Sequence, residues 1–231
     1  MFPKSALVTG GASGIGAAIA ALLEREGAHV QLLDVRDGFD VSDASAWEDV
    51  GPVELACLNA GVVTGESDVA QLSDAGYRRI LGANVDGVVF GTRRLARVME
   101  EGSAIVVTAS LAGLVAAPQD AIYTLTKHAV VGFVRAVAPQ LAERGIRINA
   151  VAPGFVDTPL LGEGRDRLQD EGFPLLQPDD VADAVLLAAR SDDTGQVWAV
   201  QPGREPLQFR FPNVPGPRDP AGASVGRPPA S

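Results

Sequence analysis

The sequence is poor in the residues that build disulfides and metal sites. Its 231 residues include one cysteine, Cys57, and two histidines, His29 and His128. A single cysteine excludes an internal disulfide and is typical of a reducing compartment. Three scattered His and Cys side chains form no metal-binding motif, so no metal is expected. Cys57 lies in an apolar run over residues 55–58, which predicts a buried strand thiol rather than a nucleophile.

Long apolar runs and excess positive charge are also absent. No stretch approaches the roughly 18 apolar residues that would span a bilayer, and the N-terminus lacks the apolar segment of a signal peptide. The formal net charge is −10, which argues against nucleic acid and anionic membrane surfaces as partners. We therefore expect a soluble cytoplasmic protein with a small-molecule partner, no nucleic-acid partner and no membrane partner.

Length and patterning predict one α/β domain. The apolar fraction of 46% is ordinary for a globular protein. Short apolar strands alternate with helical segments, which is typical of a doubly wound parallel sheet of the Rossmann type. We predict a domain over residues 1–211 and an irregular Pro- and Gly-rich tail over residues 212–231. The expected strands are Ser5–Thr9, His29–Asp34, Leu55–Asn59, Ala104–Thr108, Arg147–Ala152 and Gln196–Val200, and the expected helices are Gly14–Glu26, Asp74–Glu100, Ala121–Glu143 and Pro178–Arg190.

The first expected strand runs into a glycine cluster over residues 10–16, and an Ala- and Leu-rich helical segment follows. Strand, glycine turn and helix together favour dinucleotide binding. Glycines let the backbone approach a pyrophosphate, and the helix N-terminus supplies N–H groups and a positive dipole. Gly16 would allow the helix to pack closely on the strand. A glycine run alone is usually a simple turn, so this interpretation depends on the motifs that follow.

The second expected strand ends in Asp34, eighteen positions after Gly16. An acid at that distance suits the ribose 2′-hydroxyl of NAD and repels the 2′-phosphate of NADP. The glycine loop itself holds no Lys or Arg. Two alternatives stay open: Asp34 as a plain strand-end acid, and a preference for NADP that the nearby Arg36 would support.

Tyrosine and lysine are scarce, with two of each, yet Tyr123 and Lys127 lie four positions apart. On a helix this spacing puts both side chains on one face. An ammonium beside a phenol favours the phenolate, so we expect the pKa of Tyr123 to fall from about 10 toward neutrality. Such a phenol can exchange protons with a substrate near neutral pH. A solvated helix face is the alternative explanation for this pair.

The glycine pattern T-G-x-x-x-G-x-G and Y-x-x-x-K together resemble the short-chain dehydrogenase/reductase family in its compact, single-domain form. The resemblance covers roughly residues 5 to 202, and its details are most similar to the 15-hydroxyprostaglandin dehydrogenase type over residues 110–114, 127–128 and 153–156. Further motifs agree in order: Asn59-Ala60-Gly61 as the N-A-G motif, Asn84 as the helix asparagine, Ser110 thirteen residues before Tyr123, and Pro153-Gly154-Phe155-Val156-Asp157-Thr158 as the segment beside the nicotinamide.

The resemblance implies an NAD-dependent oxidoreductase that interconverts a secondary alcohol and its ketone by hydride transfer. Tyr123 would be the general acid/base, Lys127 would lower its pKa and hold the nicotinamide ribose, and Ser110 would orient the substrate oxygen. Asn84 would support a water relay. On residue chemistry alone, Asn84 could equally be a helix-kink amide and Ser110 a turn hydroxyl. The implied cofactor-binding residues are Gly10, Ser13, Gly14, Ile15, Gly16, Asp34, Val35, Asp40, Val41, Asn59, Ala60, Gly61, Tyr123, Lys127, Pro153, Gly154, Val156 and Thr158.

Two features depart from the family pattern. The stretch from Asp34 to Asn59 is too short for the helix between the family's second and third strands, because a parallel crossover needs about a dozen residues or more. That helix must be missing or much reduced, which leaves the adenine pocket in question. Pro139 falls inside the Tyr123 helix, removes a backbone donor and predicts a kink.

Residues 160–176 predict a short lid, and Val62, Leu111 and Leu114 would add an apolar wall, which together favour an uncharged, fairly apolar alcohol or ketone. An NADPH-preferring carbonyl reductase and a catalytically silent nucleotide-binding sensor or interaction protein are the alternatives. Apolar residues on more than one face of the two longest helices predict a homodimer or homotetramer. Phe209 and Phe211 are expected to reach the neighbouring subunit's active-site mouth.

Overall fold

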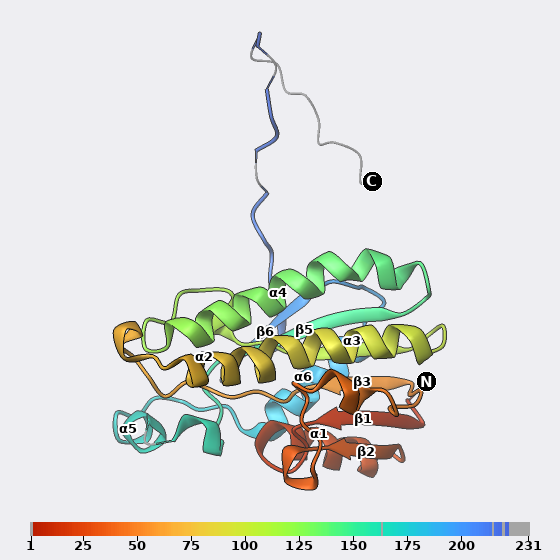
Figure 1. Ribbon diagram of the computed structural model, residues 1–231, viewed down its shortest axis with the longest axis horizontal. Coiled ribbons are helices and arrows are strands. Elements are labelled where there is room, and N and C mark those ends of the chain that lie inside the picture. The colour runs from red at the N-terminus through yellow and green to blue at the C-terminus, as the bar shows by residue number, and fades with distance from the viewer. Residues whose placement is uncertain (1, 163, 214, 219, 222–231) are drawn as a thin grey trace.

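The protein is described by a computed structural model that covers residues 2–162, 164–213, 215–218 and 220–221. A seven-stranded sheet forms its centre, in the order β2-β1-β3-β4-β5-β6-β7 (Figure 1). All neighbouring strands pair in parallel except β6 and β7, which are antiparallel. The strands are β1 Ser5–Thr9, β2 His29–Leu33, β3 Leu55–Leu58, β4 Ala104–Thr108, β5 Arg147–Pro153, β6 Val197–Val200 and β7 Leu207–Gln208.

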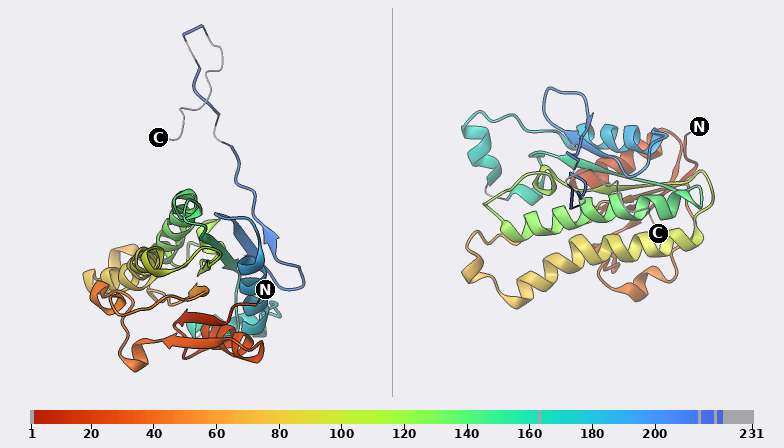
Figure 2. Two further views of the ribbon diagram at one scale, coloured as in Figure 1. Left: turned by 90° about the vertical axis from the view of Figure 1, so that its right-hand side faces the viewer. Right: turned by 90° about the horizontal axis from the view of Figure 1, so that it is seen from above.

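Helices cover both faces of the sheet, as the alternating pattern predicts (Figure 2). Strands β3 and β4 are buried along their whole length, which is expected for parallel strands that carry helices on both sides. One core cluster includes residues of α3 and α4, and a second includes residues of α1 and α6. The predicted doubly wound sheet is confirmed. The helices are α1 Gly14–Arg25, α2 Asp74–Leu81, α3 Gly87–Val98, α4 Ala121–Ala142, α5 Gly164–Asp170 and α6 Pro178–Arg190.

The connection from β2 to β3 contains no α-helix, only two short 3₁₀ turns over residues 35–37 and 44–47. The α-helix that the family has at this place is therefore absent from this connection, as the sequence predicts. No strand forms at Asp40 and Val41, so β2 is the edge of the sheet. Trp47, 2% exposed, fills the space beneath α3 and donates from Nε1 to the Val41 carbonyl at 3.0 Å.

The helix predicted over residues 74–100 is interrupted by one π-helical turn, Gly82–Asp86, between α2 and α3. Such turns place an extra residue in the helix and are frequent at functional sites. The Tyr123 helix, α4, runs through Pro139 and ends three residues later at Ala142. The proline removes only the bond that its own N–H would donate, and the helix continues for three residues beyond it.

The C-terminal segment differs from expectation. β7 was not predicted, and it pairs with β6 through Trp198 and Ala199. Phe209 donates its N–H to the Val197 carbonyl at 2.7 Å, and the Arg135 guanidinium of α4 stacks 3.7 Å from the centre of the Phe211 ring. Both phenylalanines thus contact their own chain, and their reach to a neighbouring subunit stays a prediction. The tail predicted over 212–231 lies largely outside the described residues, and residues 215–218 extend away from the body beyond α4 (Figure 1).

Candidate active site

The carboxyl ends of three neighbouring strands are joined by one asparagine. Asn59, just after β3, donates from Nδ2 to the carbonyl of Thr9 on β1 at 3.2 Å and accepts from Thr108 Oγ1 on β4 at 3.0 Å. Its own N–H and that of Ala60 both donate to Thr9 Oγ1. In an open parallel sheet, ligands bind outside this edge. Asn59 therefore joins the three strand ends next to which the sequence predicts the site.

The glycine loop has a shape that only glycine permits. Gly10 and Gly14 have φ values of 65° and 52°, which L side chains rarely adopt. A Cβ on Gly16 would lie 2.1 Å from the Gly10 carbonyl oxygen, and one on Gly10 would lie 2.9 Å from Ala60 Cα. Ser13 makes no side-chain hydrogen bond as the N-cap of α1, whose first turn has no acid. The exposed N–H groups and this close packing fit a dinucleotide's pyrophosphate.

Asp34 lies at the glycine loop, as expected. It is 7% exposed, and its carboxylate accepts from the N–H of Ala12 and the N–H of Arg36, both at 3.0 Å. The Arg36 guanidinium reaches the same loop and donates to the Ala12 carbonyl at 3.2 Å. The loop is thus flanked by an acid and a cation together, so geometry alone keeps both cofactor preferences open.

Of the residues proposed for the adenine side, two are exposed and one is buried. Val35 is 71% exposed, and Asp40 is an exposed acid whose Oδ1 accepts from the N–H and the hydroxyl of Ser42. Val41 is 8% exposed and packs into the core beneath α3. Its side chain is turned inward because the strand that would hold it at the surface has been replaced by a turn. Val35 and Asp40 remain available there, whereas the Val41 side chain is not.

Ser110, Tyr123 and Lys127 come together between β4 and α4. Lys127 Nζ donates to the Thr108 carbonyl at 2.8 Å and lies 5.5 Å from the centre of the Tyr123 ring. The Ser110 hydroxyl lies beside the Tyr123 phenol and acts to lower its pKa. Ser110 Oγ also accepts from the Ala112 N–H at 3.1 Å, so it caps a turn as well as facing the phenol.

The electrostatics of this group differ from expectation. Burial raises the pKa of Tyr123, Ser110 opposes that rise, and the Asp120 carboxylate adds to it. Burial also lowers the pKa of Lys127 from 10.5 to about 8. The expected fall in the Tyr123 pKa is therefore wrong for this structure. The desolvation of the phenolate dominates, and the Lys127 ammonium lies over the ring, bonded to Thr108, instead of at the phenol oxygen.

Asn84 lies in the π-helical turn and is 1% exposed. Its Oδ1 accepts from the Val62 N–H at 2.8 Å, and its Nδ2 donates to the Val62 carbonyl at 2.9 Å and to Thr126 Oγ1 at 3.0 Å. Both ends of the amide are thus engaged by protein, which favours the structural alternative. Asn84 and Lys127 nevertheless flank Gly61, where a Cβ would lie 3.2 Å from Asn84 Oδ1 and 3.5 Å from Lys127 Nζ.

The segment after β5 closes over the glycine loop. Thr158 is 8% exposed, and a Cβ on Gly14 would lie 3.1 Å from its Cγ2. Asp157 holds the lid through Arg165, with Nε to Oδ1 at 2.6 Å and Nη2 to Oδ2 at 3.1 Å. Sequence patterns did not reveal this ion pair, because it joins the β5 loop to α5, a helix that the sequence analysis did not predict.

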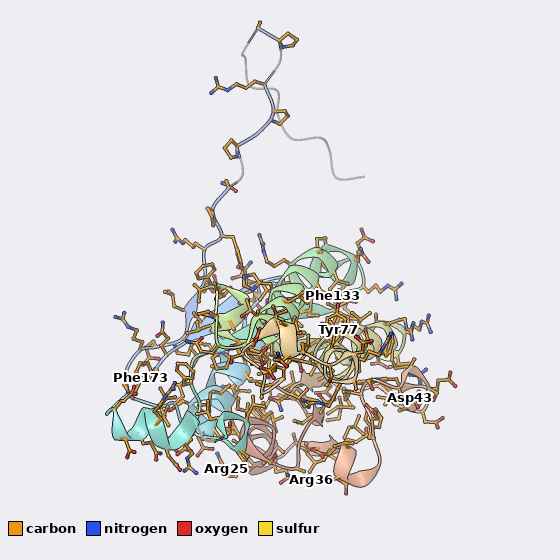
Figure 3. All side chains as sticks on the ribbon, turned by 60° about the vertical axis from the view of Figure 1, so that its left-hand side comes forward. Arg25, Arg36, Asp43, Tyr77, Phe133 and Phe173 are labelled. Atoms are coloured by element: carbon orange, nitrogen blue, oxygen red, sulfur yellow. The ribbon has the colours of Figure 1, made fainter. Side chains whose placement is uncertain are left out.

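Apolar side chains are exposed on the segments that follow β4 and β5. Phe155 and Phe173 are each 46% exposed, and their rings meet edge to face with centroids 5.6 Å apart. Figure 3 shows Phe173 at the outer side of the lid, next to α5. Val115 and Leu160 add further exposed apolar surface. Leu114, predicted as part of the wall, is half-buried and also packs against the core.

Other chemistry finds little support in the part of the chain that the structure describes. No group of three His, Cys, Asp or Glu side chains there could hold a metal ion. Cys57 is buried, and burial raises the pKa of its thiol to about 12, so it is not a reactive nucleophile. No helix within the described ranges is long and apolar enough to cross a bilayer.

The chain is similar to dehydrogenases and reductases of known sequence and structure. Residues 40–203 match the family model described as enoyl-(acyl carrier protein) reductase. Cyclohexanol dehydrogenase from Acinetobacter sp. (strain SE19) is 32% identical over 231 residues, covering 86% of this chain and 92% of the relative. A solved short-chain dehydrogenase/reductase, glucose/ribitol dehydrogenase from Brucella melitensis, is 30% identical with a TM-score of 0.79, over 87% of this chain and 96% of that one. The structure of BdcA in complex with NADPH is 29% identical with a TM-score of 0.76, over 85% and 92%.

Proposed function

This chain belongs to the short-chain dehydrogenase/reductase family, and we propose that it interconverts a secondary alcohol and its ketone with NAD as cofactor. One observation carries the proposal: Ser110, Tyr123 and Lys127 meet at the carboxyl edge of the sheet. The glycine loop that fits a pyrophosphate lies at the same edge. A silent nucleotide sensor would have no need of this group of side chains.

The acid–base chemistry follows from the three side chains. When bound, the nicotinamide accepts or supplies the hydride. Tyr123 Oη takes the hydroxyl proton during alcohol oxidation and returns a proton to the oxygen during ketone reduction. The Ser110 hydroxyl hydrogen-bonds the same oxygen and fixes its orientation. Lys127 keeps a positive charge beside the ring, and Asn84 holds the Val62 backbone and Thr126 next to it.

The direction of catalysis should depend on pH. Because burial raises the pKa of Tyr123, the phenol keeps its proton at neutral pH, which is the form that ketone reduction needs. Alcohol oxidation needs the phenolate, so it should accelerate as the pH rises. Initial rates in both directions across a pH series would check this, and identical profiles would contradict the role of Tyr123.

The NAD preference rests on Asp34, which would face a 2′-phosphate with its carboxylate. Arg36 and the NADPH bound by BdcA support the alternative of an NADPH-preferring carbonyl reductase. Fluorescence titration of NADH and NADPH would decide between them. We expect tighter NADH binding, and Arg36→Gln should weaken NADPH binding more than NADH binding. Tighter NADPH binding in the unmodified protein would overturn the NAD proposal.

For the substrate, we propose an uncharged, largely apolar secondary alcohol or ketone. The exposed rings of Phe155 and Phe173, together with Val115, offer apolar surface, and cyclohexanol dehydrogenase is a relative. The second candidate is a polyol, because glucose/ribitol dehydrogenase has the same fold. NADH formation with cyclohexanol and with ribitol compares the two directly. Faster turnover of ribitol would refute the apolar assignment.

We also propose that the protein forms a homodimer or homotetramer in the cytoplasm. Support comes from half-buried apolar residues on α3 and α4, such as Phe90 and Phe133, and from the single buried cysteine. Light scattering would test the assembly, and a monomer for the unmodified protein would contradict it. The nearer likeness to the 15-hydroxyprostaglandin dehydrogenase type is likewise a proposal, supported by the motifs at residues 110–114 and 153–156.

A further inference from the structure

Asp120 immediately precedes α4 and collects three hydrogen-bond donors on one carboxylate. Its Oδ1 accepts from the N–H of Tyr123 at 2.8 Å. Its Oδ2 accepts from the N–H of Thr64 at 2.9 Å and from Thr64 Oγ1 at 2.7 Å. The first bond caps the helix that carries the phenol, and the other two hold a loop fifty-six positions earlier in the chain. One side chain thus joins the catalytic helix to the loop that follows β3.

That loop borders the catalytic group. It begins at Gly61, which lies between Asn84 and Lys127. The Asn84 amide hydrogen-bonds both the N–H and the carbonyl of Val62. The Val63 carbonyl accepts from Arg79 Nη2 at 2.7 Å. Asn84 and Arg79 both come from the α2–α3 side, whereas Asp120 ties the loop to the N-terminus of α4.

We propose that Asp120 is a positioning residue of the active site, which fixes the first turn of the Tyr123 helix against the Thr64 loop and holds a negative charge toward the phenol. The inference rests on the proposed role of Tyr123 as proton carrier. A serine, threonine or asparagine would cap the helix equally well. Only an ionised carboxylate caps it, accepts two further donors and also acts on the phenol through its charge.

The charges around the phenol favour this role. Asp120 contributes to the raised pKa of Tyr123, whereas Lys127, the nearest cation, lies over the ring and is bonded to Thr108. Arg79 is occupied by the Val63 carbonyl, and Glu66 of the same loop accepts from the Asp68 N–H. Burial is the main reason that the phenol stays protonated, and the Asp120 charge adds to it, which favours the form that donates a proton during ketone reduction.

The chain offers a direct test, because it contains two tyrosines. In a Tyr77→Phe background, Tyr123 is the only phenol, so ultraviolet absorbance follows its ionisation without substrate. Asp120→Asn retains an acceptor oxygen for the helix cap but removes the charge. We expect its titration midpoint to shift to lower pH. The matched control, Asp179→Asn, removes one exposed charge in the first turn of α6, and should leave the midpoint in place.

A second readout tests the loop. Asp120→Ala removes all three bonds, so amide hydrogen exchange at Thr64 should accelerate at least about tenfold, as expected for losing a hydrogen bond to a charged group. If alkaline unfolding hides the titration, the pH profile of kcat/KM reports the same ionisation. A midpoint that moves no further in Asp120→Asn than in the control would overturn the charge role. Unchanged exchange in Asp120→Ala would overturn the loop role. Neither the absorbance titration nor the amide exchange requires turnover, so Tyr123→Phe tests the catalytic proposal separately.

Discussion

The buried ammonium of Lys127 should make the protein more stable in mildly alkaline solution. Lys127 is 4% exposed, and burial lowers its pKa from 10.5 to about 8. Because the unfolded chain regains the ordinary pKa, it binds more protons than the folded chain between these two values. The free energy of unfolding therefore rises with pH across this window, and the charged lysine costs stability below pH 8.

The size of the effect follows from the shift. A difference of about 2.5 pKa units corresponds to roughly 3 kcal/mol at neutral pH. Integrated over the folded and unfolded ionisations of Lys127, the free energy of unfolding should rise by about 2 kcal/mol between about pH 7 and pH 9.5. Tyr123 acts in the opposite direction, since its raised pKa lowers stability only where the unfolded chain's tyrosine ionises, above about pH 10. The buried Cys57 thiol, whose pKa is raised from 9.0 to about 12, also lowers stability once the unfolded chain's thiol ionises near pH 9, so Lys127 has to be isolated by comparison with a variant that lacks it.

The assay is denaturant unfolding at several pH values, followed by the fluorescence of Trp47, which is buried in the core. Lys127→Met is the matched control, because it keeps the length of the side chain and removes the titrating group. The difference in unfolding free energy between the two proteins isolates Lys127 from every other ionisation. That difference should change by about 2 kcal/mol over the window. Parallel curves for the two proteins would refute the reasoning.

Three further changes test other parts of the site. Tyr123→Phe should lower kcat at least about a hundredfold while the NADH dissociation constant stays nearly unchanged, and appreciable activity in the purified variant would contradict its role. Asp34→Ser should narrow the gap between NADH and NADPH affinity, and an unchanged gap on titration of both cofactors would show that Asp34 does not repel the phosphate. Gly16→Ala should weaken NADH binding and lower Tm, because its Cβ would lie 2.1 Å from a carbonyl oxygen, whereas Gly51→Ala has open space and should change neither.

The sequence predicted those parts of the site that depend on local pattern. The glycine loop, Asp34 and the Ser110–Tyr123 spacing each follow a strand, and parallel topology brings the carboxyl ends of strands to one edge. The helix at Pro178–Arg190 was predicted with the bounds that the structure has, because proline marks its start and its apolar positions are periodic.

What the sequence missed depends on burial and on distant partners. The Tyr123 pKa depends on how much protein surrounds the phenol, which no spacing reveals. The contacts of Phe211 with Arg135 and of Asp157 with Arg165 join separate elements whose arrangement patterns do not give. The π-helical turn at Asn84 was missed because its sequence continues a normal helical pattern on both sides.

Glycines on the neighbouring helix leave room for the segment that replaces the missing helix on the adenine side. Three glycines of the π-helical turn and α3 face the segment that replaces the missing helix: a Cβ at Gly82, Gly87 or Gly91 would lie 2.9, 2.8 or 2.7 Å from side-chain atoms of Ser42, Val41 or Trp47. The segment can therefore approach α3 closely. The π-helical turn that leads into α3 also carries Asn84, whose amide hydrogen-bonds the Val62 backbone.

It follows that the trimmed adenine side and the proton chemistry are separable. The contacts of Trp47 and Val41 stabilise α3 and the adenine side, whereas the ionisation of Tyr123 depends on burial, Ser110 and Asp120. A change such as Gly91→Leu would strike the Trp47 ring, so its cost should fall on stability and cofactor affinity. The pH at which Tyr123 ionises should remain where it was, because no group that sets it has moved. Trp47 and Val41 pack closely on α3, next to the glycines Gly87 and Gly91, and none of the groups that set the Tyr123 pKa lies in the segment that replaces the missing helix.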